Sequence, residues 1–265
     1  MITNLGKFKR LEKIFPCGEK SFIVPIDDLL ICGTEQHLKN FNEQIPLFSS
    51  LPIDAVLGFP GVFNQFRNEL KDKAWIINLT TSTKLGVHTD KKWSLSLLNA
   101  IANGADAVAV HVNMTSPNEN EMIQTLGQIS CECQIAGIPL MAIIYARKPG
   151  KTQDDNYEEL KIDDNGAYTE LICHACRVAV ELGADIIKTN FTGSTDSFKR
   201  VIRSAGGVPV VIAGGTVVSE DEIVTNASSA ISAGAAGVCF GRNFFVRSDI
   251  RSFSEKINGV LHNGG

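Results

Sequence analysis

Three residues at the ends of short apolar runs, Lys188, Tyr145 and Asp27, are suited to covalent chemistry on a carbonyl group. Lys188 lies in segment 186–191, which follows a glycine and reads as a buried strand. Burying an unpaired ammonium is costly, so we expect a partly desolvated amine that can lose its proton. Such an amine attacks a ketone to form a Schiff base. The alternative is that Lys188 reaches the surface or pairs with a structural carboxylate.

Tyr145 and Asp27 would supply the proton transfers of imine chemistry. Dehydration of a carbinolamine needs an acid, and the resulting iminium is an electron sink for making or breaking the adjacent C–C bond. Tyr145 can move a proton at the imine or the reacting carbon, and Asp27 can accept one from a substrate hydroxyl. Each also has a structural explanation: Tyr145 as a rim aromatic, and Asp27 with Asp28 as caps of the next helix.

Glycines after two later apolar runs indicate a phosphate site. Gly214 and Gly215 follow one run, and Gly241 and Arg242 follow the next. Glycine allows backbone N–H groups to approach a phosphate closely, and arginine can add a bidentate contact. The alternative is a pair of tight turns with a surface arginine.

Eight apolar segments must position these residues, and we expect each to be a strand: 22–27, 55–59, 75–80, 107–112, 139–145, 186–191, 209–214 and 237–242. Their spacing leaves room for helices, and their near-continuous apolar character suits strands buried on both faces. The pattern Gly-Ala-Asp or Gly-Ala-Ala precedes three of them, at 104, 183 and 234, as a helix end followed by a tight turn. This order predicts an α/β fold, a (β/α)8 TIM barrel forming a single domain over 1–265, with a lead-in helix in 1–20. A doubly wound open sheet is the alternative.

His111 and Arg147 extend the predicted site. His111 ends the fourth predicted strand on the same face, where it either contacts substrate or is a hydrogen-bonded rim residue. Arg147 opens the polar connection 146–165, whose length suits a substrate cover or a mobile excursion. His88 and Trp75 are interpreted as structural.

The composition of the chain limits the kinds of partner and the cellular compartment that we expect for the protein. The chain of 265 residues is 44% apolar with a net charge of −4 and no basic block, so neither nucleic acid nor an anionic membrane is indicated as a partner. No run is long enough to span a membrane, and no signal peptide is recognised. Seven scattered cysteines predict reduced thiols and a cytoplasmic protein. The pairs at 131/133 and 173/176 allow a zinc site to be imagined, but buried small hydrophobes are the expected reading.

Several motifs together resemble the archaeal-type class I aldolases (DeoC/LacD-like, DhnA-type), which include fructose-bisphosphate aldolase and 2-amino-3,7-dideoxy-D-threo-hept-6-ulosonate synthase. The most specific is Lys-Thr-Asn-Phe-Thr-Gly at 188–193, followed by Thr-Asp-Ser-Phe at 195–198. Further matches are the lead-in at 10–15, the first strand end at 25–27, the segments 104–108 and 111–113, and the phosphate segments 211–215 and 241–243.

This resemblance implies a barrel with an imine-forming lysine at Lys188, an aspartate acid/base at Asp27 and a tyrosine proton donor at Tyr145. It further implies phosphate contacts at Gly214, Gly215, Gly241 and Arg242, a homo-oligomer, a phosphorylated small-molecule substrate, and no metal or other cofactor.

The departures from the family concern the substrate. The family's Met-Asp-His-Gly is here Ile-Asp-Asp-Leu at 26–29, and its Tyr-Pro-Arg is Tyr-Ala-Arg at 145–147. A second carboxylate, Asp28, favours a cationic group on the acceptor, as in an aspartate-semialdehyde-like aldehyde joined to a dihydroxyacetone phosphate-like donor. Three alternatives stay open: fructose-bisphosphate aldolase proper, thiolase-like acyl transfer on a phosphorylated diketone, and a phosphate-binding barrel without chemistry.

Overall fold

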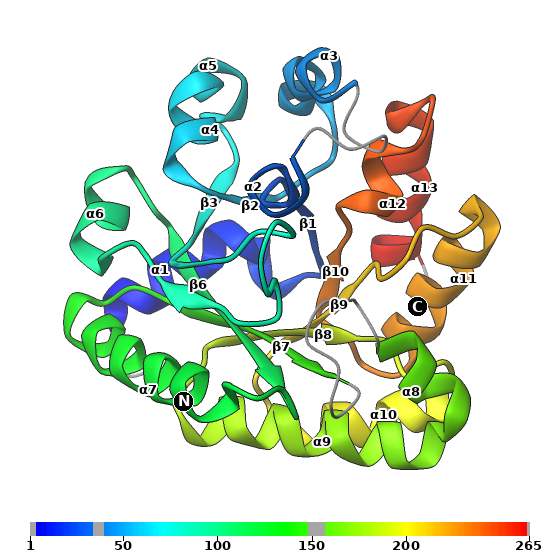
Figure 1. The fold of residues 1–265 in the computed structure, drawn as a ribbon. Coiled ribbons are helices and arrows are strands. Elements are labelled where there is room, and N and C mark those ends of the chain that lie inside the picture. The colour runs from blue at the N-terminus through cyan, green and yellow to red at the C-terminus, as the bar shows by residue number, and fades with distance from the viewer. Residues whose placement is uncertain (1–3, 34–39, 148–156, 264–265) are drawn as a thin grey trace.

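The structure, a computed structural model, describes residues 4–33, 40–147 and 157–263. Its centre is a closed barrel of parallel strands surrounded by helices (Figure 1). The ring order is β1-β10-β9-β8-β7-β6-β3-β2. The strands are β1 (Ser21–Pro25), β2 (Ala55–Gly58), β3 (Ala74–Asn78), β6 (Ala107–Met114), β7 (Leu140–Ala146), β8 (Ile186–Asn190), β9 (Val210–Ala213) and β10 (Gly237–Cys239).

Each of the eight segments predicted as strands forms one, and the TIM barrel is confirmed in place of the open sheet. The helices are α1 (Leu5–Ile14), α2 (Asp28–Cys32), α3 (Phe41–Gln44), α4 (Pro60–Gln65), α5 (Arg67–Leu70), α6 (Leu97–Ala102), α7 (Glu119–Ala136), α8 (Tyr157–Asp163), α9 (Asn165–Glu181), α10 (Thr195–Ser204), α11 (Glu220–Ser232), α12 (Arg242–Phe245) and α13 (Ile250–Asn263), with 3-10 turns at Pro16–Gly18 and Ile45–Ser50. Among the described residues, none of these helices combines the length and apolarity needed to cross a bilayer.

Two apolar layers follow from the alternation of side chains along each strand. One layer fills the barrel, with Ile23, Ile76, Met141 and Ile186 among its members, and the larger layer lies between strands and helices. Alternate residues share a face, so Lys188 continues the inward row that begins at Ile186. The C-terminal end of the barrel therefore receives polar side chains directly above an apolar interior.

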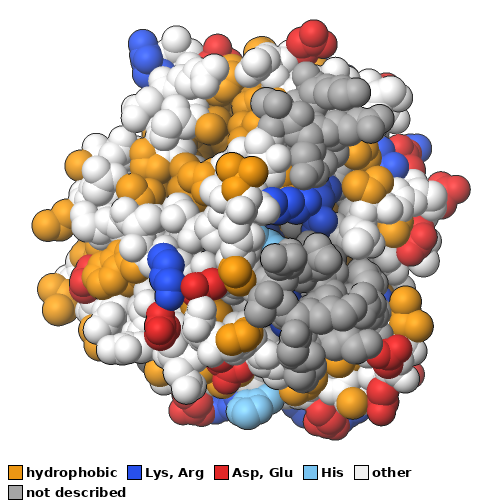
Figure 2. Space-filling model, viewed as in Figure 1, with side chains coloured by type: hydrophobic (Ala, Val, Ile, Leu, Met, Phe, Trp, Pro, Cys, Tyr) orange, Lys and Arg blue, Asp and Glu red, His pale blue; other side chains and the backbone are white. Residues whose placement is uncertain are grey.

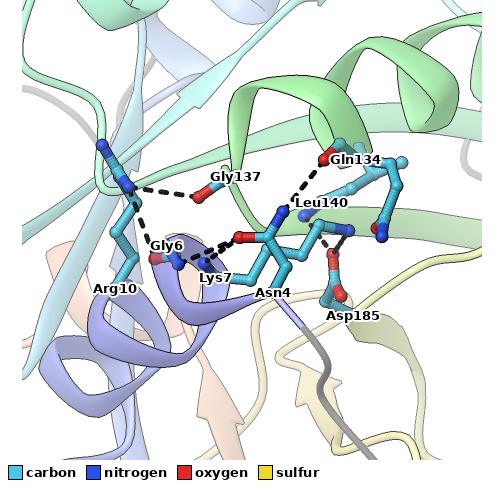
Figure 3. Close-up of polar contacts among 8 residues, drawn as sticks. All are labelled: Asn4, Gly6, Lys7, Arg10, Gln134, Gly137, Leu140 and Asp185. Carbon is cyan, nitrogen blue, oxygen red and sulfur yellow. Dashed lines mark hydrogen bonds and ion pairs between the residues drawn. The ribbon is translucent and has the colours of Figure 1, made fainter.

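Helix α1 closes the opposite end of the barrel, where Leu11, Ile14 and Phe15 join the interior cluster. Its Lys7 Nζ lies 2.8 Å from Asp185 Oδ2, which also accepts a hydrogen bond from the backbone N–H of Leu140 at 2.9 Å (Figure 3). The aspartate of this Gly-Ala-Asp segment thereby joins the N-terminal helix to the start of a neighbouring strand.

Asp106 repeats this arrangement on the other side of α1. Its Oδ1 lies 2.6 Å from Lys13 Nζ, and its Oδ2 accepts from the backbone N–H of Trp75 at 3.0 Å. Gly104, like Gly183, has a left-handed φ (84° and 83°), as the predicted helix ends require. Trp75 stacks on Phe63 with ring centroids 4.7 Å apart, which agrees with its structural interpretation.

Candidate active site

One pocket opens at the C-terminal ends of the barrel strands, and all ten residues predicted for the site line it. They are Asp27, Asp28, His111, Tyr145, Arg147, Lys188, Gly214, Gly215, Gly241 and Arg242. The barrel explains this convergence, since the carboxyl ends of its parallel strands meet at one face. Figure 2 shows Lys or Arg side chains beside a histidine at the centre of this face.

Lys188 points into the pocket from β8 and is only 6% exposed. Burial lowers the pKa of Lys188, but the negative charges that Cys239, Tyr145 and Asp27 carry when ionised raise it, and the net shift is upward. This net shift is opposite in direction to the one that burial alone would produce. A raised pKa favours the protonated amine, so attack on a ketone would first require that the proton of Lys188 move to a neighbouring group.

Cys239 on β10 is a neighbour of Lys188 that the sequence analysis did not single out, since it appeared there only as part of the apolar segment 237–242. Its thiol lines the pocket beside Lys188, and burial raises the pKa of Cys239 to about 11. The group is thus a neutral thiol at physiological pH and positions the amine from the floor of the pocket. Cys239 ends the last strand, and its side chain belongs to the cluster that fills the barrel. An inward orientation could have been considered once the barrel was predicted.

Asp27 follows β1 and holds its carboxylate inside the pocket. Its Oδ2 accepts a hydrogen bond from Asn78 Nδ2 at 3.0 Å, and it makes no side-chain cap to α2, so the capping explanation fails. Burial raises the pKa of Asp27 despite the opposing charge of Lys188. A buried carboxylate of raised basicity beside an ammonium is suited to accept its proton.

Asn78 was missed by the sequence analysis and fixes this corner of the site. Its Oδ1 accepts from the backbone N–H of Thr80 at 3.1 Å and from Thr80 Oγ1 at 3.0 Å. Its amide nitrogen is consequently the atom turned toward Asp27. A polar residue at the end of an apolar strand was the available signal.

Tyr145, Arg147 and His111 form a connected group on β7 and β6. The rings of Tyr145 and His111 meet edge-on with centroids 5.0 Å apart, and the Arg147 guanidinium lies 5.4 Å from the Tyr145 ring centroid. Arg147 Nε donates to Asn113 Oδ1 at 2.7 Å. Arg147 is 1% exposed, so it orients Tyr145 as part of the pocket wall.

His111 is a buried neutral imidazole. Burial, followed by the charges of Lys91, Arg147 and Lys188, holds the pKa of His111 well below its usual range. Its Nε2 has no hydrogen-bond partner among the described residues, while the ring lines the pocket. This places on the wall a polar atom that a substrate group can satisfy.

The lowered pKa of His111 predicts a pH dependence of stability. Below about pH 6.5 the unfolded chain binds a proton at this histidine that the folded protein does not, so stability is present above that pH and is lost as the pH falls. Relative to His111→Gln, the wild-type protein should lose up to about 1.4 kcal/mol more of its unfolding free energy per pH unit. Urea denaturation at pH 7, 6 and 5 measures this difference, and parallel losses in both proteins would contradict it.

The glycine turns after β9 and β10 are held together by Asn243, which is fully buried. Its Nδ2 donates to the carbonyl oxygens of Gly214 at 2.9 Å and Thr216 at 2.8 Å. A Cβ at Gly241 would lie 3.0 Å from the carbonyl oxygen of Pro25, so this close approach favours glycine. Arg242 is within 3.8 Å of Asp28 at the pocket edge.

The loop between β3 and α6 contributes pocket residues that the sequence analysis did not predict: Lys84, His88 and Lys91. His88, which was interpreted as structural, is buried and also lines the pocket. The loop returns over the barrel mouth through the two-residue strands β4 (Thr80–Thr81) and β5 (Lys92–Trp93), which pair antiparallel. No local sequence signal marked this long-range placement.

The remaining predictions concern the cover and the metal. Of the predicted cover 146–165, residues 148–156 lie outside the described residues, and 157–163 form helix α8. Within the described parts of the chain, no three His, Cys, Asp or Glu side chains gather as a metal site would require. Cys173 and Cys176 are buried in α9.

The chain is similar to known aldolases and synthases over most of its length. The model of the DeoC/LacD family aldolases matches residues 22–247. The chain is 34% identical over 262 residues to a 2-amino-3,7-dideoxy-D-threo-hept-6-ulosonate synthase from Halobacterium salinarum, covering 98% of this chain and 93% of that one.

A second relative and a solved structure extend the comparison. A 2-amino-4,5-dihydroxy-6-oxo-7-(phosphonooxy)heptanoate synthase from Streptomyces griseus is 32% identical, over 93% of this chain and 86% of its own. The fold matches that of an archaeal fructose 1,6-bisphosphate aldolase with a TM-score of 0.82 at 23% identity, over 97% and 99% of the two chains. The chain therefore belongs to the DeoC/LacD family of aldolases.

Proposed function

We propose that this aldolase joins a phosphorylated ketone to an amino-acid aldehyde through a Schiff base on Lys188. The observation that carries the proposal is the buried Lys188 side chain, which lines one pocket with Asp27, Tyr145 and the glycine turns. The donor phosphate would bind at Gly214, Gly215, Gly241 and Arg242, which places its ketone over β8.

The chemistry begins with proton transfer from Lys188 to Asp27, whose pKa burial raises. The free amine adds to the ketone, and the carbinolamine loses water to give an iminium. Asp27, having given its proton to the leaving water, accepts the proton of the adjacent carbon, and the resulting enamine attacks the aldehyde carbon. Tyr145 then protonates the new alkoxide, and water releases the product and regenerates the amine.

The acceptor is inferred from the relatives' names. The product named for the Streptomyces griseus enzyme carries a 6-oxo group beside a 7-phosphonooxy group, with hydroxyls at carbons 4 and 5. Breaking its bond between carbons 4 and 5 yields dihydroxyacetone phosphate and a four-carbon 2-amino acid with an aldehyde at carbon 4. We propose an acceptor of this kind for the present enzyme.

Asp28 lies beside Arg242 at the edge of the pocket. This carboxylate was expected to favour a substrate amino group, but it already lies 3.8 Å from Arg242. Support for the amino-acid aldehyde therefore comes from the relatives and not from Asp28. That the enzyme is a homo-oligomer remains a prediction.

The test compares acceptors at a fixed concentration of dihydroxyacetone phosphate. Aspartate 4-semialdehyde should give at least tenfold higher kcat/KM than glyceraldehyde 3-phosphate, measured as loss of the ketone phosphate. If glyceraldehyde 3-phosphate were the better acceptor, the enzyme would be a fructose-bisphosphate aldolase and the proposed acceptor would be wrong.

A further inference from the structure

The loop after β3 lies across the barrel mouth from the glycine turns. In the ring, β3 and β9 are separated by β6, β7 and β8, which places them on opposite sides of an eight-stranded barrel. Lys188 and Tyr145 lie on β8 and β7, between these two sides. A substrate held by its phosphate at β9 and β10, with its ketone at Lys188, therefore extends its other end toward β6 and the β3 loop.

This loop is held in place by contacts to neighbouring elements. Asn113 Nδ2 donates to the carbonyl oxygen of Thr89 at 2.7 Å, and the backbone N–H of Lys84 donates to the carbonyl oxygen of Ile31 at 2.8 Å. Ser82 Oγ donates to the carbonyl oxygen of His88 at 2.6 Å. These contacts connect the loop to β6 and α2, so its side chains have defined positions at the mouth.

The side chains that this loop turns into the pocket are basic. Lys91 is 3% exposed, with Nζ 2.7 Å from Ser82 Oγ, and Lys84 lines the same pocket with an exposed side chain. Arg147 approaches from the end of β7, and the positive charges of Lys91 and Arg147 both lower the pKa of His111. His111 adds a buried Nε2 that has no hydrogen-bond partner among the described residues. Cationic groups and an unsatisfied polar atom thus meet on this side.

We infer that Lys84, Lys91 and His88 form a second anion subsite, which binds an anionic group at the far end of the acceptor aldehyde. The inference rests on the proposed function and adds to it the recognition of the acceptor. His111 would contact the chain of the same acceptor between this group and Lys188. A carboxylate and a phosphate share the required chemistry, and both suit lysine ammonium groups.

Matched acceptors test the subsite in the wild-type enzyme, with dihydroxyacetone phosphate as donor. Succinic semialdehyde carries a carboxylate that butanal lacks, and glyceraldehyde 3-phosphate carries a phosphate that glyceraldehyde lacks. We expect kcat/KM at least tenfold higher for one or both anionic acceptors than for the uncharged partner. The pair with the larger ratio identifies the anion.

Lys84→Gln should lower that ratio about tenfold, mainly by raising KM for the anionic aldehyde while leaving the uncharged aldehyde unaffected. Lys91→Gln should act in the same direction. The matched control is Lys92→Gln, on the same loop, because Lys92 is exposed and paired with Glu121 at 2.5 Å outside the pocket. This control should keep the wild-type ratio.

Trapping of the donor separates the two proposals. Borohydride reduction with dihydroxyacetone phosphate alone requires no acceptor, so a stable adduct supports the proposed function whatever the aldehyde preference. Two results would overturn the anion subsite alone, provided that the adduct forms. One is equal kcat/KM for charged and uncharged aldehydes in the wild type. The other is a ratio of these two kcat/KM values that is the same in Lys84→Gln and Lys91→Gln as in the wild type. Absence of the adduct would overturn the proposed function.

Discussion

Lys188→Met is expected to lower kcat for condensation by about 10⁴-fold or more, with no adduct formed on borohydride reduction. The substitution removes the nitrogen that forms the covalent bond, and no other described lysine shares its position between Asp27 and Cys239. The methionine side chain has a similar length, so the apolar interior beneath it is retained. Loss of dihydroxyacetone phosphate in the presence of an aldehyde measures the effect.

Lys7→Met is the matched control, because Lys7 is also buried but pairs with Asp185 at the other end of the barrel. Breaking this buried pair should cost roughly 3–5 kcal/mol of stability. Turnover per folded molecule should nevertheless stay at the wild-type level. Activity in Lys188→Met within tenfold of the wild type would show that the reaction does not pass through this amine.

Tyr145→Phe is expected to lower kcat by about 10²–10⁴-fold while the donor imine still forms. Only the hydroxyl is lost, so the ring keeps its contacts with His111 and Arg147. Proton transfer to the new alkoxide then depends on water. The expected signature is normal borohydride trapping combined with slow product formation.

Tyr168→Phe serves as the control, since Tyr168 is a fully buried tyrosine of α9 outside the pocket. It should turn over like the wild type once any loss of folded protein is corrected for. If Tyr145→Phe also turned over at the wild-type rate, another group would be the proton donor. If it lost donor trapping entirely, Tyr145 would be needed for imine formation itself.

The barrel was predictable because its strands are apolar runs separated by helix-length segments, and because glycines mark the helix ends. The site followed from the fold, since polar residues at strand ends converge at one face. Asn78 and Asn113 carried the same signal, since each lies at or near the end of its strand, but neither was assigned to the site. Their inward orientation becomes evident only from the register of the closed ring.

The charge state of Lys188 was not predictable from its own segment. Burial alone lowers the pKa of an amine, and the opposite net shift depends on acidic groups such as Asp27, which comes from a distant part of the sequence. The basic side chains of Lys84 and Lys91 were missed for the same reason. Their loop reaches the pocket through contacts with Ile31 and Asn113, which are distant in sequence.

The most direct test of the account is the mass spectrum of peptides from the wild-type enzyme after borohydride reduction with dihydroxyacetone phosphate. We predict a mass increase on the peptide that contains Lys188, corresponding to the reduced ketone phosphate bound through its ketone carbon. An adduct on a different lysine, or an unmodified protein under conditions in which the enzyme turns over, would contradict the central role of Lys188.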